Sequence, residues 1–136
     1  MVQNIMIEIK CAHCNHSLMD EGKQLDSKHA IRIKVSHGDA TGFVYLSSIY
    51  GSYTKEFEQV PDEHNGIYEF ACPYCNKAMD VVGLCECKAP MISLLLKQGG
   101  RIKICTRNGC QHHSMEFEDM NDAFQLLVNN DPTGLG

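Results

Sequence analysis

The stretch Cys72-Pro73-Tyr74-Cys75 is the part of the chain from which the fold can be worked out. A second pair with the same two-residue gap stands upstream, in Cys11-Ala12-His13-Cys14. Two further pairs follow downstream, Cys85-Glu86-Cys87 and Cys105 with Cys110. Two thiols in one tight turn can share a metal ion but seldom meet disulfide geometry. Eight cysteines in four close pairs therefore predict two tetrahedral metal sites.

The composition is that of a folded, water-soluble protein. The chain has 136 residues, of which 43% are hydrophobic and 21% are charged. Residues 1–10 lack the basic and then apolar pattern of a signal peptide, and no run approaches the roughly 18 apolar residues of a membrane span. We therefore expect a cytoplasmic protein without membrane attachment. In a reducing compartment, paired thiols are more often metal ligands than disulfides.

The segment between the first two cysteine pairs, residues 15–71, has the pattern of an antiparallel sheet. Apolar and polar residues alternate over 5–10 and 31–36, which predicts half-buried strands. Residues 43–50 are apolar on both faces and predict a central strand, and further strands are expected over 53–60 and 67–71. The polar residues 15–29 predict a loop, and Asn65-Gly66 predicts a hairpin turn. A metal would pin the two ends of this sheet together.

The second half of the chain predicts a smaller unit. Residues 76–83 are expected to form a short connection, and 91–96 and 101–105 two strands around Gly99-Gly100. A third strand is expected over 114–117. An apolar stripe with helical period then predicts a C-terminal amphipathic helix capped by Asp119; its members are Met120, Ala123, Phe124, Leu127 and Val128.

Together these patterns predict an α+β fold that is mostly antiparallel β. We expect two domains: residues 1–83 form a β-domain with the first metal site, and residues 84–136 form a second metal unit with the C-terminal helix. No internal repeat is evident beyond the cysteine pairs.

Thiolates are the preferred ligands of structural zinc, so the expected cofactors are two Zn²⁺ ions. Sequential pairing gives one site from Cys11, Cys14, Cys72 and Cys75, and another from Cys85, Cys87, Cys105 and Cys110. We prefer this pairing because residues 88–104 form a self-contained hairpin, but an interleaved arrangement stays open. The nearby histidines could replace a cysteine, although the cysteines already suffice; they are His13, His16, His112 and His113.

Residues 84–117 resemble a zinc ribbon, the rubredoxin-like hairpin module of transcription factors, topoisomerase tails and many small bacterial proteins. The matching residues are Cys85, Cys87, the Gly99-Gly100 turn, Cys105 and Cys110, with a one-residue gap in the first pair where ribbons usually have two or more. The resemblance covers about a quarter of the chain. It implies a metal-stabilised scaffold and no single function.

Three redox alternatives compete with zinc. Cys72-Pro73-Tyr74-Cys75 is identical to the glutaredoxin active-site motif, which would have to open a helix in a βαβ setting. A rubredoxin-like iron site would make the chain an electron-transfer protein. Four cysteines would also accept an iron–sulfur cluster.

The charge is uneven along the chain and provides the main indication of a partner. The net charge is −5, yet residues 84–113 carry five basic side chains against Glu86. Candidate contacts to phosphate or to an acidic partner are Lys97, Arg101, Lys103 and Arg107. Because residues 84–113 contain no Phe, Tyr or Trp, they offer no platform for base stacking.

No nucleophile–base arrangement or phosphate loop is evident, so we expect neither catalytic residues nor a small-molecule substrate. The favoured function is a non-enzymatic zinc-binding interaction module, an accessory or regulatory subunit of a larger assembly that could itself be an enzyme complex. Nucleic-acid binding through the ribbon is the alternative, followed by iron-based electron transfer.

Overall fold

The computed structural model describes residues 5–97, 99–110 and 113–116, which form ten strands and no helix. The predicted α+β class is therefore wrong for this part of the chain, which is all-β because its apolar residues recur with period two. The predicted helix over Met120–Val128 lies outside the described residues. Nowhere in the described ranges does a helix exist that could cross a bilayer. The strands are β1 (Ile9–Lys10), β2 (Met19–Leu25), β3 (Lys28–His37), β4 (Ala40–Leu46), β5 (Lys55–Glu58), β6 (Glu69–Ala71), β7 (Val81–Leu84), β8 (Pro90–Leu96), β9 (Arg101–Cys105) and β10 (His113–Glu116).

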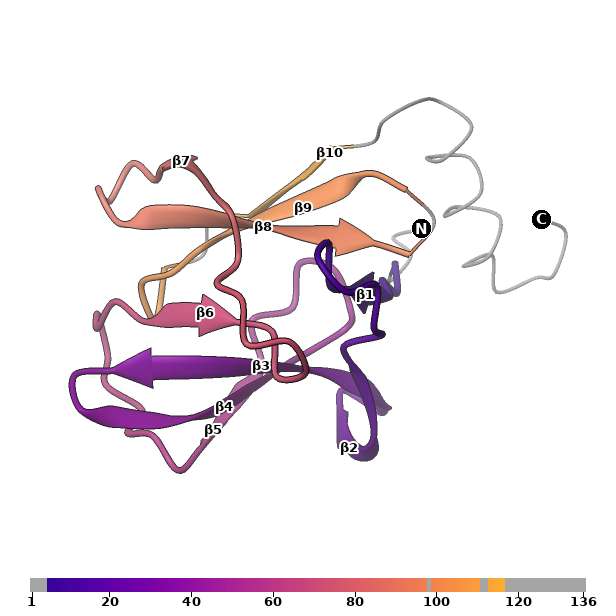
Figure 1. Cartoon of the computed structure of the whole chain (residues 1–136), viewed down its shortest axis with the longest axis horizontal. Helices are drawn as coiled ribbons and strands as arrows, with labels where there is room; N and C mark the ends of the chain where they lie inside the picture. The colour runs from indigo at the N-terminus through magenta and orange to yellow at the C-terminus, as the bar shows by residue number, and fades with distance from the viewer. Residues whose placement is uncertain (1–4, 98, 111–112, 117–136) are drawn as a thin grey trace, which may run out of the picture.

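The strands form two antiparallel sheets of five strands each, which lie as two layers in Figure 1. In the β3 sheet the order is β2-β3-β4-β5, and β6 also pairs with β3. In the β8 sheet the order is β1-β8-β9-β10, and β7 also pairs with β8. The predicted hairpin of strands 91–96 and 101–105 is confirmed as β8 and β9.

The two sheets exchange one short strand each. Strand β1 directly precedes the first cysteine pair, yet it joins the β8 sheet, where Ile9 faces Leu96. Strand β6 directly precedes the second cysteine pair, yet it joins the β3 sheet, where Phe70 faces Val35. Each half of the chain therefore supplies one strand to the sheet built mainly by the other half.

The exchange reflects an internal repeat, which we did not predict from the sequence. Three backbone contacts of the first half recur in the second. The isolated bridges Lys10↔Ser17 and Met6↔Ile49 correspond to Ala71↔Ala78 and Ile67↔Arg107. The hydrogen bond from the Leu18 N–H to the Ile9 carbonyl corresponds to the one from the Met79 N–H to the Phe70 carbonyl. Residue numbers shift by 61 before the β3–β4 hairpin and by 58 after it, since the β8–β9 hairpin is three residues shorter. We call β1–β5 the first repeat and β6–β10 the second.

The core lies between the inner faces of the two sheets. Residues at matching positions of the repeats fill it, and each is 3% exposed or less: Ile31 with Ile92, Ile33 with Leu94, and Val44 with Ile102. They belong to one hydrophobic cluster that includes residues from both 1–83 and 84–136. Fully burying an aliphatic side chain of this size stabilises a fold by about 1.5–3 kcal/mol, so the two sheets stabilise each other.

The loop predicted over residues 15–29 is wrong, because β2 and the start of β3 lie there. Asp26 and Ser27, both with left-handed backbone (φ 55° and 66°), join the two strands in a tight turn. The middle of β2 is mostly exposed and irregular, so its side chains need not be apolar. A solvated, bulged edge strand gives no alternating pattern to recognise.

Two further local predictions are corrected. Asn65 does take the left-handed conformation of a turn (φ 67°), but β5 pairs with β4 and β6 pairs with β3, so no hairpin forms. Instead, the Asn65 N–H donates to the Asn108 carbonyl (2.9 Å), and the Asn108 N–H donates to the Gly66 carbonyl (2.7 Å). The connection predicted over 76–83 contains the start of β7, whose side chains are exposed.

We expect Leu94→Ala to lower the free energy of unfolding by about 2–5 kcal/mol, because Leu94 is 2% exposed at the centre of the core. Urea unfolding of the metal-loaded protein measures this change. The matched control is Val81→Ala, since Val81 is 63% exposed and its truncation should cost less than about 0.5 kcal/mol. Equal effects of the two substitutions would contradict the assignment of this core.

Candidate metal centres

The structure gathers the eight cysteines into two groups of four. Within each group the sulfur atoms all lie within 4.8 Å of one another. The first group contains Cys11, Cys14, Cys72 and Cys75, and the second contains Cys85, Cys87, Cys105 and Cys110. The grouping is the sequential one, and the interleaved arrangement does not occur.

The first group is built from two turns with the same hydrogen bonds, which we call knuckles. In one, the Cys11 N–H donates to the His16 carbonyl (2.9 Å), and the Asn15 N–H donates to the Cys11 carbonyl (2.9 Å). The other knuckle repeats both bonds 61 positions later, from Cys72 to Lys77 and from Asn76 to Cys72. Asn15 and Asn76 both have left-handed backbone (φ 62° and 63°), which Asn tolerates better than most residues. The asparagine that follows each Cys-x-x-Cys pair is a sequence signal that we did not use.

The sulfur separations of the first group fit a tetrahedral metal. The Sγ atoms of Cys11 and Cys75 are 3.7 Å apart, and those of Cys14 and Cys72 are 3.8 Å apart. A tetrahedral zinc ion with Zn–S bonds of about 2.3 Å would separate its sulfurs by about 3.8 Å. A disulfide would bring two of them to about 2.05 Å. The protein therefore holds these thiols at metal-ligand spacing.

Backbone N–H groups in each knuckle point at its buried sulfur. The Cys11 sulfur accepts from His13 (3.3 Å) and Cys14 (3.4 Å), and the Cys72 sulfur accepts from Tyr74 (3.3 Å) and Cys75 (3.5 Å). Burial raises the pKa of Cys11, but hydrogen bonds outweigh this effect and lower the pKa to about 7. Burial raises the pKa of Cys72 to about 12. A metal bound by all four sulfurs as thiolates would therefore displace a proton from Cys72.

The second group combines the loop between β7 and β8 with the end of β9 and the turn after it. In the loop, the Cys85 N–H donates to the Ala89 carbonyl (2.9 Å), and the Lys88 N–H donates to the Cys85 carbonyl (2.8 Å). The sulfurs of Cys85 and Cys110 are 3.6 Å apart, and those of Cys87 and Cys105 are 3.4 Å apart. These distances also fit a tetrahedral tetrathiolate site.

Arg107 supports the second group directly. Its Nε donates to the Cys87 sulfur (3.4 Å), and its terminal nitrogens donate to the carbonyls of Asn65 (3.0 Å) and Cys87 (3.2 Å). The Ala89 N–H and the Arg107 guanidinium lower the pKa of Cys87 to about 6. Burial lowers the pKa of Lys55, a residue we did not predict here, while the charges of Asp62, Cys105 and Cys110 act in the opposite direction. Positive charge of this kind offsets the excess negative charge of four thiolates around a divalent ion.

The other three predicted basic contacts lie in separate surroundings. Lys97 forms an exposed ion pair with Glu8, with 3.6 Å between Nζ and Oε2. Arg101 and Lys103 alternate along β9 with two buried isoleucines, as predicted, and Arg101 donates to the Ser93 hydroxyl (3.4 Å). Arg107, by contrast, donates a hydrogen bond to the sulfur of Cys87, a candidate metal ligand.

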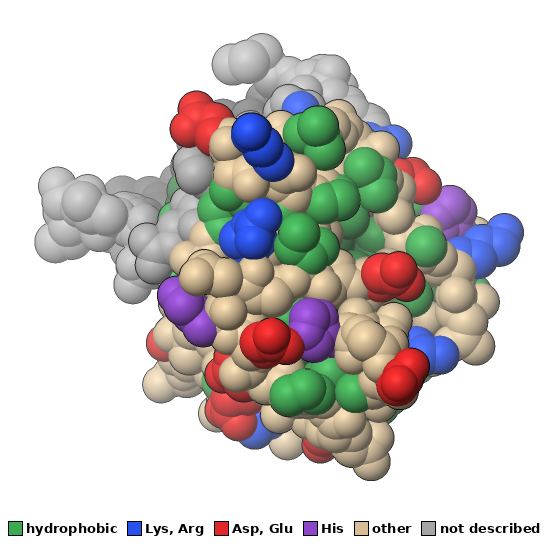
Figure 2. All heavy atoms as spheres, turned by 90° about the vertical axis from the view of Figure 1, so that its left-hand side faces the viewer, with side chains coloured by type: hydrophobic (Ala, Val, Ile, Leu, Met, Phe, Trp, Pro, Cys, Tyr) green, Lys and Arg blue, Asp and Glu red, His purple; other side chains and the backbone are tan. Residues whose placement is uncertain are grey.

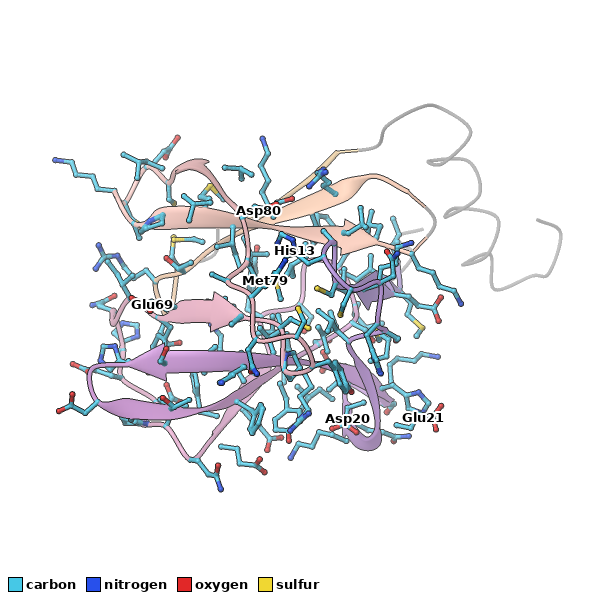
Figure 3. All side chains as sticks on the ribbon, in the orientation of Figure 1. His13, Asp20, Glu21, Glu69, Met79 and Asp80 are labelled. Carbon is cyan, nitrogen blue, oxygen red and sulfur yellow. The ribbon has the colours of Figure 1, made fainter. Side chains whose placement is uncertain are left out.

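The histidines beside the first group are engaged elsewhere. The His13 Nε2 lies 3.5 Å from a carboxylate oxygen of Asp80, and Figure 3 shows these two side chains close together. The His16 ring stacks on Tyr74 at 3.6 Å between ring centroids. The side chains of residues 112 and 113 lie outside the described part of the structure.

The glutaredoxin-like hypothesis for Cys72 and Cys75 is wrong. The pair follows β6 in an antiparallel sheet, and its sulfurs are grouped with those of Cys11 and Cys14. A glutaredoxin-type thiol pair would stand at the start of a helix, and the described residues contain none.

Comparison with known proteins gives no match, whether with family models, curated sequences or solved structures. The zinc-ribbon resemblance therefore rests on the β8–β9 hairpin and on the arrangement of Cys85, Cys87, Cys105 and Cys110. Any statement of function has to be argued from these groups and from the surface around them.

We expect the purified protein to bind two metal equivalents, and Cys75→Ser to reduce this number to about one. The matched variant is Cys110→Ser, which should remove the metal of the second group. Cys75→Ser should lower the melting temperature more, because the first site closes 57 residues (15–71) and the second only 17 (88–104). Loop closure alone makes this difference about 1 kcal/mol. Elemental analysis and thermal melts measure both effects, and two equivalents retained by Cys75→Ser would refute the first site.

We also expect Arg107→Met to weaken metal binding at the second group about 10- to 100-fold, the usual cost of losing a side chain that supports a ligand. Competition with a chromogenic chelator measures the affinity of each site. Arg101→Met serves as the control, since Arg101 lies on the same hairpin but bonds to Ser93. Equal affinities in the two variants would show that the guanidinium does not support this site.

Proposed function

We propose that this chain is a non-enzymatic zinc-binding interaction module, an accessory or regulatory subunit of a larger, cytoplasmic assembly. In each group four thiols would complete a tetrahedral coordination shell. A catalytic metal keeps one position open for water or substrate, and these sets leave none. The metals would therefore stabilise the fold and take no part in a reaction.

The arrangement of the second group supports zinc. Strands β8 and β9 form an antiparallel hairpin, with Cys85 and Cys87 before it and Cys105 and Cys110 at its other end. This order resembles a zinc ribbon, in which the metal joins the two ends of a hairpin. The elemental analysis that counts the bound metal also tests its identity, because iron in the purified protein would favour electron transfer.

The observation that carries the proposed interaction is the exposed apolar surface of β7. Val81 is 63% exposed, Val82 42% and Leu84 73%. Strand β2 occupies the same place in the first repeat, and its exposed middle residues, Glu21 and Gly22, are not apolar. Because matching strands in one molecule differ in this way, the apolar side chains of β7 are not a requirement of the fold. Exposed apolar side chains of this kind are typical of a surface that another protein covers.

The charge beside β7 indicates what kind of partner would fit. Figure 2 views the side of the molecule on which the β7–β8 loop lies, and shows hydrophobic side chains gathered with Lys and Arg side chains beside them. Lys88, in that loop, is exposed and close in sequence to Leu84. Because the exposed residues Asp80 and Glu86 also flank β7, we propose a protein partner whose contact surface is apolar at its centre and carries charges of both signs at its rim.

We expect the tagged full chain to retain a partner from a lysate of its source cells, and the variant Val82→Asp/Leu84→Asp to lose it. A charge placed on an apolar contact surface prevents close packing and leaves an unpaired buried group. The control is Ile67→Asp, because Ile67 is 41% exposed and lies outside β7.

Quantitative mass spectrometry of the three pull-downs gives the result. A partner retained equally by all three chains would contradict docking through β7. Retention that disappears after nuclease treatment would favour the nucleic-acid alternative instead.

A further inference from the structure

The second metal centre has a counterpart in the first repeat. The shift of 58 positions that relates β4 to β9 carries Ser47 to Cys105 and Ser52 to Cys110. The backbone after β4 and the backbone after β9 have the same conformation. Gly51 and Gly109 have φ angles of 90° and 94°. The Ser52 N–H donates to the Ile49 carbonyl (3.0 Å), and the Cys110 N–H donates in the same way to the Arg107 carbonyl (3.2 Å). Two serines of the first repeat therefore occupy the places of two metal-ligating cysteines.

The other half of the metal centre also has a counterpart. The loop Cys85–Ala89 is closed by the bond from the Cys85 N–H to the Ala89 carbonyl, and Leu25 faces Lys28 in the matching turn. Lys28 and Ala89 are related by the shift of 61 positions. The turn of the first repeat is one residue shorter: Leu25 takes the place of Cys85, and Asp26 lies in the turn where the second repeat presents Cys87.

Asp26 makes the contacts that a metal would make in the other repeat. The hydroxyls of Ser47 and Ser52 both donate to its Oδ2 at 2.6 Å, and the Thr54 hydroxyl lies 3.4 Å from Oδ1. The Ser47 and Ser52 hydroxyls hold the pKa of Asp26 below its usual value, so the carboxylate is ionised at neutral pH. One anion therefore joins the turn to both ends of the segment 47–52.

We propose that Asp26, Ser47 and Ser52 form a metal-free version of the second metal centre, and that the backbone around them is a latent third tetrahedral site. In the protein as it stands, the carboxylate joins the β2–β3 turn to the β4–β5 connection through hydrogen bonds. In the second repeat a metal bound by the four cysteines would join the matching segments through thiolates. The hydrogen bonds of Asp26 and the four thiolates thus hold the same backbone arrangement.

The chemistry of the donor sets explains why one place needs a metal and the other does not. Four thiolates repel one another, so they stay together only around a cation. A carboxylate accepts hydrogen bonds and serine hydroxyls donate them, so Asp26 and the two serines are complementary without an ion. The latent site lacks thiolates, and cysteines at these places should restore metal binding.

The test is a graft within the full chain. Residues 25–28 are replaced by the five residues of the second repeat that run from Cys85 to Ala89, together with Ser47→Cys and Ser52→Cys. We expect three zinc equivalents by elemental analysis, and a cobalt-substituted form with about 1.5 times the thiolate charge-transfer absorption of the parent chain. A folded graft that binds only two equivalents would overturn the proposal.

A matched control separates a built site from adventitious binding by extra thiols. It carries the same five-residue loop but keeps Ser47 and Ser52, and it should bind two equivalents. Three equivalents in this control would also count against the proposal, because the metal would then not need the serine positions.

A second measurement uses the natural sequence with one substitution, so it does not depend on whether the graft folds. Asp26→Ala removes the acceptor of both serine hydroxyls, and we expect hydrogen exchange of the amides in 47–52 to accelerate about tenfold or more. Exchange over 105–110 should stay unchanged, since the metal holds that segment. Unchanged exchange over 47–52 would show that Asp26 does not hold this connection.

Discussion

Four sulfur atoms join the two repeats where these meet. Cys11 and Cys14 come from the first repeat, and Cys72 and Cys75 come from the second at positions shifted by 61. Because the shift relates Cys11 to Cys72 and Cys14 to Cys75, the Cys11–Cys75 and Cys72–Cys14 contacts are equivalent, and the two repeats contribute to the group in the same way. A metal bound there would take two ligands from each repeat and could not be bound by either repeat alone.

The exchanged strands depend on this group. Lys10 ends β1 directly before Cys11, and Ala71 ends β6 directly before Cys72. These strands have two and three residues, too short to keep their places by pairing alone. A metal that fixes the two knuckles also fixes where β1 and β6 enter the opposite sheets. The inner-face side chains of both sheets then pack into one core.

The sequence predicted the cysteine groups and most of the strands, but not the repeat. The sequence spacing of the cysteines was sufficient to predict the two groups, because a metal-binding knuckle needs its two thiols close together in the chain. The repeat lies mainly in main-chain hydrogen bonds, which residues as different as Lys10 and Ala71 form equally well. Arg107 was assigned to a phosphate or acidic partner because its charge was visible in the sequence and its proximity to Cys87 was not.

The differences between the two repeats show at which positions the same backbone can be held by different side chains. The same backbone is held by a carboxylate at Asp26 and by thiolates at the second group, so a metal is not needed there for the connection itself. What a metal in the second group would do in addition is order the loop that follows β7. Leu84, the most exposed of the large apolar side chains described, directly precedes Cys85. A metal bound by the second group would therefore fix the end of the strand whose apolar side chains face solvent, and this would link the metal to the proposed contact surface.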